Sequence, residues 1–187
     1  SADYLVTTTP STVLKATSIA DYSFILNNSV TIAMDAASLT TDTRNKGYVY
    51  VKQGDYSTDY HIKIDAIEYT RITPDGSTSG DRAKIDTENI AAELLAAIGS
   101  LSGFTITRLG STIEIKKDDG SDFELQISDS LGDGAMGAIK NDADAFTDLP
   151  LYCRDGQRVL VKGDVENNYD DYYVKFIADS PDNTPFG

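Results

Sequence analysis

The side chains best suited to acid–base and nucleophilic chemistry are scarce in this sequence. His61 is the only histidine and Cys153 the only cysteine, so a histidine pair, a cysteine metal cage or an internal disulfide has no second member. His61 shares one face of a predicted strand with the charged residues Lys63 and Asp65, which favours an exposed strand residue over a general base. Arg154 follows Cys153 and can lower the pKa of its thiol, but no nucleophile motif surrounds the two residues. We therefore interpret Cys153 as a small packed side chain and predict no catalytic residue.

A glycine-rich segment has the spacing of a dinucleotide-binding fingerprint. Gly132-Asp133-Gly134-Ala135-Met136-Gly137 follows a predicted strand, as that fingerprint requires. The fingerprint also needs a long helix whose N-terminus meets the pyrophosphate, and an acidic residue about 20 positions further on. Only Ala138-Ile139-Lys140 follow before Asn141-Asp142. We interpret the segment as a flexible turn and predict no cofactor.

Two Asp-rich turns raise calcium binding as an alternative. Their carboxylate and amide side chains are Asp118, Asp119 and Asp122 in the first turn, and Asp164, Glu166, Asn168 and Asp170 in the second. Neither turn has the glycine at the sixth position and the glutamate at the twelfth that a helix-loop-helix calcium loop needs. Aspartate also favours turns because it accepts hydrogen bonds from its own backbone. The sequence favours turns over metal sites, and a rise in melting temperature at millimolar calcium would reverse that interpretation.

Tyrosines near the end of the chain suggest a second alternative, a carbohydrate-binding platform. The chain has 11 tyrosines and no tryptophan, and Tyr169, Tyr172 and Tyr173 cluster in the sequence. Successive residues of a strand point to opposite faces, so Tyr172 and Tyr173 cannot share one flat surface. We expect one of them to pack inward and the other to meet solvent or a neighbouring subunit.

Charge excludes several classes of partner. Sixteen Lys and Arg against 30 Asp and Glu give a formal net charge of −14, which opposes contact with nucleic acid and with anionic membranes. The acidic residues are scattered, as on a well-solvated surface. No apolar run approaches the roughly 20 residues that span a bilayer, and the first residues lack the pattern of a signal peptide. We expect no tight binding of nucleic acid and no membrane partner, and a single cysteine fits a chain made in a reducing cytoplasm.

Residues 47–146 have the pattern of one α+β unit. Alternation predicts strands at 48–52, 60–65 and 67–73, and turn residues follow the third. A helix is predicted over Thr87–Ile98, with Asp86 as its N-cap, Gly99 as its terminating residue and an apolar stripe through Leu94. Next come a hairpin that pairs 104–109 with 112–116 and a strand at 123–127. In that hairpin Leu109 should face Thr112, Ile106 should face Ile115 and Arg108 should face Ile113.

The predicted fold class is α+β: a mostly antiparallel β-sheet with one main helix packed on it, in a β-β-β-α-β-β-β unit bracketed by β-strand flanks. Residues 1–46 should form a β flank of a larger scaffold, 47–146 an inserted α+β domain, and 147–187 a returning β flank with strands at 158–162 and 172–176. The chain begins at Ser1 rather than Met, and we expect it to be an internal fragment of a longer protein.

Several stretches resemble the tail tubular protein B family, the nozzle proteins of short-tailed bacteriophages. They are Thr8-Thr9-Pro10 through Asp21-Tyr22-Ser23-Phe24-Ile25-Leu26-Asn27, Gly47-Tyr48-Val49-Tyr50-Val51-Lys52, Ile85-Asp86-Thr87, Phe146-Thr147-Asp148-Leu149-Pro150 and Asp170-Asp171-Tyr172-Tyr173-Val174-Lys175-Phe176. They span nearly the whole chain, although none is diagnostic by itself.

The resemblance implies a structural protein at the distal end of a virion tail, made in the host cytoplasm. Its partners would be other copies of the parent protein, in a ring of six around the channel through which DNA leaves, and neighbouring tail proteins. It implies no enzyme activity, no active residues and no cofactor. A receptor- or glycan-binding module of a phage tail or cell surface is the alternative function, and a small hydrolase with paired acidic residues is the third.

Overall fold

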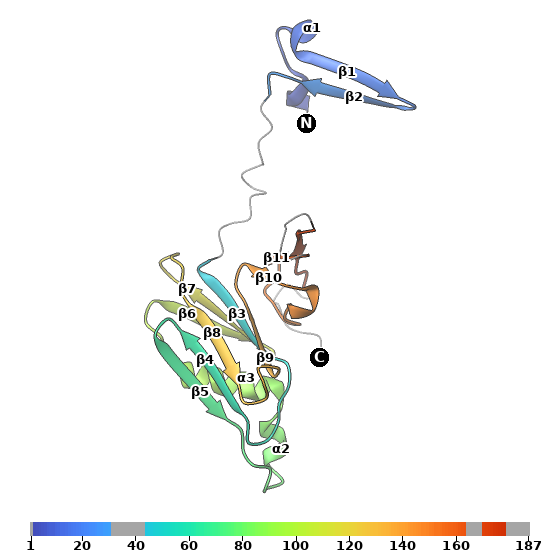
Figure 1. Cartoon of the computed structure of the whole chain (residues 1–187). Coiled ribbons are helices and arrows are strands. Elements are labelled where there is room, and N and C mark those ends of the chain that lie inside the picture. Colours follow the sequence, from blue (N-terminus) through green and yellow to red (C-terminus); the bar gives the residue numbers. More distant parts are fainter. Residues whose placement is uncertain (1, 31–43, 164–169, 179–187) are drawn as a thin grey trace. The chain divides into compact units, whose positions relative to one another are not determined.

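The computed structural model of the chain describes residues 2–30, 44–163 and 170–178. The chain divides into two compact units, Ser1–Thr40 (unit 1) and Thr41–Gly187 (unit 2), and each is described by itself (Figure 1). No helix in the described part of the chain is long and apolar enough to cross a membrane.

Unit 1 is built around one antiparallel hairpin. A 3-10 helix η1 (Ala2–Leu5) and a short helix α1 (Pro10–Val13) precede strands β1 (Leu14–Ile19) and β2 (Tyr22–Asn27), which pair over their full lengths. Strand β1 starts only at Leu14, because the proline at the first helical position allows a helical turn that includes Thr12 and Val13.

Asn27 fastens η1 to the end of the hairpin. It is 1% exposed, and its side-chain amide donates to the Tyr4 carbonyl oxygen at 2.8 Å. Its backbone N–H donates to the Tyr4 hydroxyl at 2.9 Å, and its side-chain oxygen accepts the Ser29 N–H at 2.9 Å. All of the polar groups of this buried side chain therefore have partners, as burial requires.

The described residues of unit 2 form three sheets and one long helix (Figure 1). Its strands are β3 (Lys46–Val51), β4 (Asp59–Ile64), β5 (Ile67–Ile72), β6 (Phe104–Leu109), β7 (Thr112–Lys117), β8 (Leu125–Asp129), β9 (Met136–Ile139), β10 (Asp142–Ala143), β11 (Arg158–Val161) and β12 (Tyr172–Lys175). The orders are β6-β7-β3-β9, β5-β4-β8 and β10-β11-β12. All pairs are antiparallel except β10 with β11. The mostly antiparallel α+β class is therefore confirmed.

Helix α3 (Thr87–Ile98) holds the first two sheets together, and its predicted bounds are confirmed. The Asp86 carboxylate accepts the N–H groups of the first turn, and Gly99 ends the helix with a φ of 59°. The predicted stripe is buried and packs against strands of both sheets. The main core has the following buried members: Val49, Val51, Tyr60, Ile62, Ile64, Ile90, Ala91, Leu94, Ile98, Ile113, Ile115, Phe123, Ala135 and Met136.

The β6–β7 hairpin has the predicted register. Leu109 faces Thr112, Ile106 faces Ile115, and the turn between the strands opens on Gly110 with a φ of 57°. This positive φ explains why glycine stands at the first turn position.

The predicted order of elements in the unit was incomplete. A short helix α2 (Asp81–Lys84) precedes α3, and β9 adds a strand at the edge of the four-stranded sheet. Strand β8 begins at Leu125 rather than at Phe123, which is buried just before it. Strand β10 pairs with β11, so backbone hydrogen bonding crosses the predicted boundary between residues 146 and 147.

Strand β3 is buried on both faces, because it lies inside a sheet that is covered on both sides. Val49 and Val51 belong to the main core, whereas Tyr48 and Tyr50 belong to a second core on the opposite face. A continuous apolar run is the pattern expected of such a strand. β3 is therefore the element that joins the two cores.

Gly54 marks a close approach between two backbone segments. A Cβ on Gly54 would overlap the carbonyl oxygen of Ile85, which lies directly before the N-cap of α3. We expect Gly54→Ala to destabilise the chain by about 1–3 kcal/mol, because a backbone atom must shift to make room. Gly80→Ala is the matched control, since no atom lies within 4 Å of its Cβ position and its φ is −76°. Urea unfolding of both variants tests this, and equal midpoints would contradict it.

Candidate functional site

The second core lies where the described part of residues 143–176 packs on the four-stranded sheet, and we call this contact the joint. Its buried members are Tyr48, Tyr50, Ile139, Ala143, Cys153 and Val159, with Leu149, Val174 and Phe176 partly buried around them. A 3-10 helix η2 (Phe146–Asp148) and strands β11 and β12 supply the covering side. This joint unites segments that are about a hundred residues apart in the sequence, such as Tyr48 and Gln157.

An ion pair between a buried carboxylate and a partly exposed arginine stabilises this joint. Glu114, in the middle of β7, is 4% exposed, and Arg154 lies over it. The Arg154 Nε–H lies 3.0 Å and 2.9 Å from the two Glu114 carboxylate oxygens, and Nη2 also contacts Oε2. The Thr107 hydroxyl donates to Glu114 Oε2 at 3.1 Å. A two-pronged arginine contact of this kind fixes geometry as well as charge.

Two tyrosine hydroxyls extend the polar contacts. The Tyr48 hydroxyl lies 3.2 Å from Glu114 Oε1 and 3.0 Å from Gln157 Oε1, and its single proton serves one of them at a time. The Tyr50 hydroxyl donates to the Asp148 carbonyl oxygen at the end of η2. Both side chains point from β3 into the joint, so β3 positions the segments that contain Asp148 and Gln157.

The titratable groups of the joint are held in one protonation state near neutral pH. Burial, with the nearby Cys153 and Glu114, raises the pKa of Tyr48 far above its ordinary value. Burial also raises the pKa of Tyr50 to about 12 and that of Cys153 to about 11. Burial alone would raise the pKa of Glu114, but hydrogen bonds and charge from Arg154 outweigh it and lower that pKa. The cysteine is thus a neutral packed thiol, as predicted, and the cluster stabilises structure.

His61 lies on β4, where the sequence placed it, with a half-buried side chain. Its Nδ1 is 3.0 Å from the Thr70 hydroxyl and 3.3 Å from a Glu68 carboxylate oxygen, both on the adjacent strand β5. These are cross-strand contacts on one face of the sheet. Cys153 lies elsewhere, in the second core, so the structure does not bring the two residues together.

The glycine-rich segment folds as a turn followed by a strand. Gly132 and Asp133 have φ values of 73° and 60°, and the Asp129 carboxylate accepts the N–H groups of Leu131 and Met136 at 2.8 Å and 3.1 Å. Strand β9 follows, where a dinucleotide fingerprint would open a helix. The segment therefore has no helix N-terminus to offer a pyrophosphate.

The first Asp-rich turn uses its carboxylates locally. Asp119 accepts the N–H and the hydroxyl of Ser121 at 2.8 Å and 2.7 Å, and Asp122 pairs with Lys140. Asp118 accepts the Thr105 hydroxyl at 2.7 Å. Among the described residues, no three His, Cys, Asp or Glu side chains gather as metal ligands would.

The remaining predicted candidates lie at the end of the chain. In the second Asp-rich turn, Asp164, Glu166 and Asn168 fall outside the described residues, as does Tyr169. Tyr172 and Tyr173 are adjacent residues of β12, so they point to opposite faces, and they are 45% and 61% exposed. The expectation that one of them packs inward is wrong, because both are exposed and Val174 is the residue of β12 that packs on the second core.

An apolar groove of about 430 Å³ opens between the segment after η2 and strand β12. The groove is lined by Ile139, Val159 and Phe176, which pack in or against the second core. Phe146 and Leu151 line it as well. Phe146 is 63% exposed and Leu151 is 83% exposed, although both are large and apolar. Exposed apolar side chains around a groove are typical of a surface that contacts another protein.

Comparison with known proteins gives two matches. The family model described as bacteriophage nozzle protein matches residues 1–183. The tail tubular protein gp12 of Escherichia phage T7 is 25% identical over 184 residues, which are 95% of this chain and 23% of that protein. The chain thus spans about a quarter of the length of this relative.

Proposed function

Because the chain belongs to the bacteriophage nozzle protein family, a family of virion tail components, we propose that it forms part of the wall of a tail channel through which DNA is ejected. The single observation that carries this proposal is the family match over residues 1–183. The contacts of Tyr48 and Arg154 with the buried Glu114 support a structural role, because they connect strands β3 and β7 to the segment that follows η2.

In this proposal the chain acts through its shape and packing and is not an enzyme. Its only cysteine is buried and neutral at physiological pH, and its only histidine makes cross-strand contacts to Thr70 and Glu68. A glycan-binding function would need a flat aromatic platform, and Tyr172 and Tyr173 point to opposite faces of β12. The structure therefore favours the tail component over the binding module.

The proposed partners are other copies of the parent protein, in a ring of six, and neighbouring tail proteins. A closed ring needs two different complementary surfaces on each subunit. Electron microscopy of the purified full-length protein tests this proposal. Closed rings with six-fold symmetry are expected, and exclusively monomeric particles at micromolar concentration would count against the ring.

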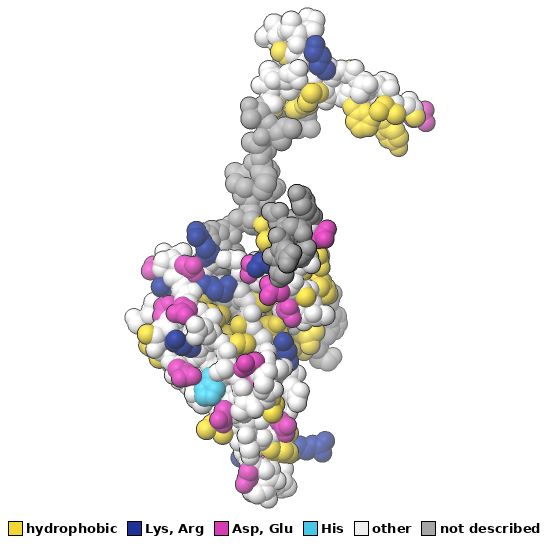
Figure 2. Space-filling model, viewed as in Figure 1, with side chains coloured by type: hydrophobic (Ala, Val, Ile, Leu, Met, Phe, Trp, Pro, Cys, Tyr) yellow, Lys and Arg dark blue, Asp and Glu magenta, His cyan; other side chains and the backbone are white. Residues whose placement is uncertain are grey.

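We expect the chain to show no measurable affinity for double-stranded DNA at physiological salt. Its net charge is −14, and Figure 2 shows acidic and basic side chains interspersed on the visible face of unit 2. A wall of this charge repels phosphates and lets DNA slide past. A gel-shift titration measures this, with a chain in which exposed aspartates are replaced by lysines as the positive control. A retarded band for the natural chain would contradict it.

We further propose that residues 47–146 are a domain inserted into a scaffold formed by residues 1–46, 147–187 and further parts of the parent protein. The distribution of exposed large apolar side chains supports this division. Eight lie in residues 2–30 and four in the described residues of the short segment 147–178, whereas the much longer segment 47–146 has five. The middle segment thus buries its apolar surface within this chain, whereas the segments on either side leave much of theirs open.

A further inference from the structure

The β1–β2 hairpin has no core of its own. Every residue of its two strands is exposed except Leu14, which is half-buried, and Asn27, which is polar. A two-stranded hairpin is at best marginally stable in water, and a third strand or another covering element is needed for stability. The hairpin therefore lacks, within the described part of unit 1, the covering element that would stabilise it.

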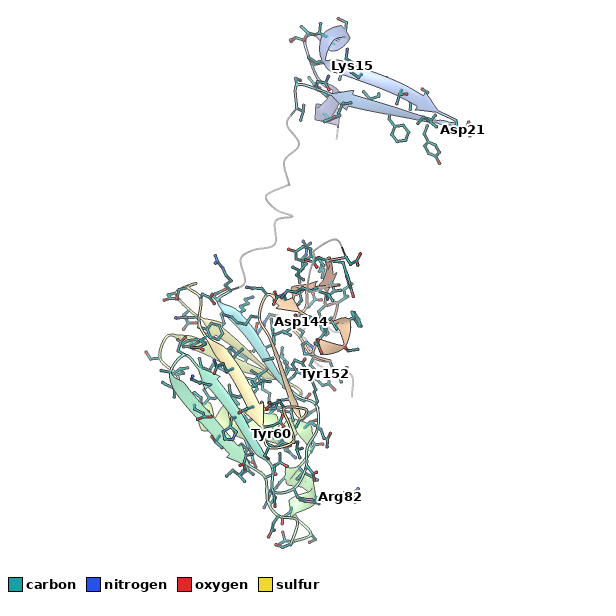
Figure 3. All side chains as sticks on the ribbon, in the orientation of Figure 1. Lys15, Asp21, Tyr60, Arg82, Asp144 and Tyr152 are labelled. Atoms are coloured by element: carbon teal, nitrogen blue, oxygen red, sulfur yellow. The ribbon has the colours of Figure 1, made fainter. Side chains whose placement is uncertain are left out.

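One face of the hairpin is strongly apolar. The register sets Ile19 opposite Tyr22, Thr17 opposite Phe24 and Lys15 opposite Leu26, so these side chains share a face. Four of them are large and apolar: Ile19 is 64% exposed, Tyr22 72%, Phe24 58% and Leu26 49%. In Figure 2 apolar side chains gather along this hairpin, and Figure 3 places Asp21 at its tip and Lys15 toward its other end.

Both outer edges of the hairpin are open. Strands β1 and β2 form a two-stranded sheet, so each has one edge without a strand partner among the described residues. Proteins protect an open edge with charged side chains, proline or a bulge. Lys15 is the only charged residue in either strand, and the pairing is regular from Leu14 to Ile19. A strand built to remain uncovered in solution would carry more of these features.

We propose that β-strands of the parent polypeptide, from outside these 187 residues, extend this hairpin at an edge and cover the face formed by Ile19, Tyr22, Phe24 and Leu26. The length of the matched relative points to this occupant. The match covers 23% of the T7 relative, so that protein has over three times as many residues outside the matched part as inside it. A segment of the same polypeptide meets the hairpin at a high effective concentration, which favours it over a separate molecule. This proposal rests on family membership and on the hairpin, and it does not depend on where in the virion the protein works.

Hydrogen exchange measured by mass spectrometry tests the proposal on three samples. They are the 187-residue chain at a concentration where it is monomeric, the full-length protein as a monomer, and the full-length protein in its assembled form. Amides in peptides covering residues 14–27 should exchange within seconds in the 187-residue chain. In the full-length monomer they should exchange at least ~100-fold more slowly, because the covering strands give them stable partners.

A substitution on the apolar face gives a second measurement. Phe24→Thr keeps strand propensity but removes the aromatic contact, so hairpin protection in the full-length monomer should fall at least ~10-fold. The same substitution at Phe146, which is 63% exposed and belongs to unit 2, is the matched control and should leave hairpin protection unchanged.

Three results would overturn the proposal. Protection of residues 14–27 in the monomeric 187-residue chain would mean that this chain covers its own hairpin. Protection that appears only in the assembled form would assign the face to another copy. Rapid exchange in every sample would show that nothing covers it. None of these outcomes bears on whether the protein is found in the tail, so the two proposals fail separately.

Discussion

Replacing Leu94 with aspartate should abolish the cooperative unfolding transition of unit 2. Leu94 is 0% exposed, and its helix α3 packs against strands of both large sheets. The new carboxylate would lie among apolar side chains without a partner, a cost that exceeds the few kcal/mol by which small domains are stable. Thermal unfolding followed by circular dichroism, with ¹H–¹⁵N spectra at 25 °C, should show a chain without fixed tertiary structure.

Two controls separate burial of charge from damage to the helix. Ala96→Asp puts the same residue on an exposed position of α3 and should cost less than about 1 kcal/mol. Leu94→Ala should leave a folded chain that is about 2–5 kcal/mol less stable, because it leaves a cavity instead of a charge. A Leu94→Asp chain that melts cooperatively within a few degrees of the natural one would refute the packing described for α3.

Removing the Arg154 guanidinium should destabilise the chain by about 3 kcal/mol, because it leaves the Glu114 carboxylate buried and unpaired. This value is at the lower end of the usual cost of breaking a buried ion pair, because the Arg154 side chain is 43% exposed, whereas the Glu114 side chain is 6% exposed. Urea unfolding of Arg154→Ala, Glu114→Gln and the double variant completes a cycle. The double variant should be clearly more stable than the sum of the single effects predicts.

Arg82→Ala is the matched control, since Arg82 is an exposed arginine on α2, and its effect should stay within about 0.5 kcal/mol. Additive single effects in the cycle would show that Glu114 and Arg154 do not stabilise each other.

The same pair predicts a pH dependence. The pKa of Glu114 is lower in the folded chain than its ordinary value of 4.5, so folding favours the ionised form. Its contribution to stability is complete above pH 4.5 and is lost as the pH falls through the lower folded pKa. Between pH 5 and pH 3 the natural chain should therefore lose more stability than Glu114→Gln, and parallel curves would contradict this.

Local sequence patterns predicted the elements whose ends are set by neighbouring residues. Asp86 and Gly99 delimit α3 because capping depends on side chains within three residues of the helix end. The β6–β7 register follows from Gly110, whose positive φ sets a two-residue turn, and from the alternation of Ile113 and Ile115. In each case the information lies within a few residues of the feature.

The second core depends on contacts between residues that are distant in the sequence, so local patterns did not predict it. Glu114 and Arg154 are 40 positions apart, and neither has a local pattern that points to the other. One signal that was not used is the continuous apolar run from Gly47 to Val51, which is typical of a strand buried on both faces. The alternation of Ile113 and Ile115 left Glu114 on the face expected to meet solvent. Strand β9 was missed because its glycine-rich segment has low strand propensity, and Gly137 packs against the Tyr50 ring.

The most direct test of the central claim, that this chain is a structural part of a phage tail, is antibody labelling of purified virions. Antibodies raised against the 187-residue chain would be applied to virions of the phage that encodes it and located by electron microscopy. We expect the label at the distal end of the tail on most particles. Virions that carry no label, or label confined to the capsid, would contradict the account.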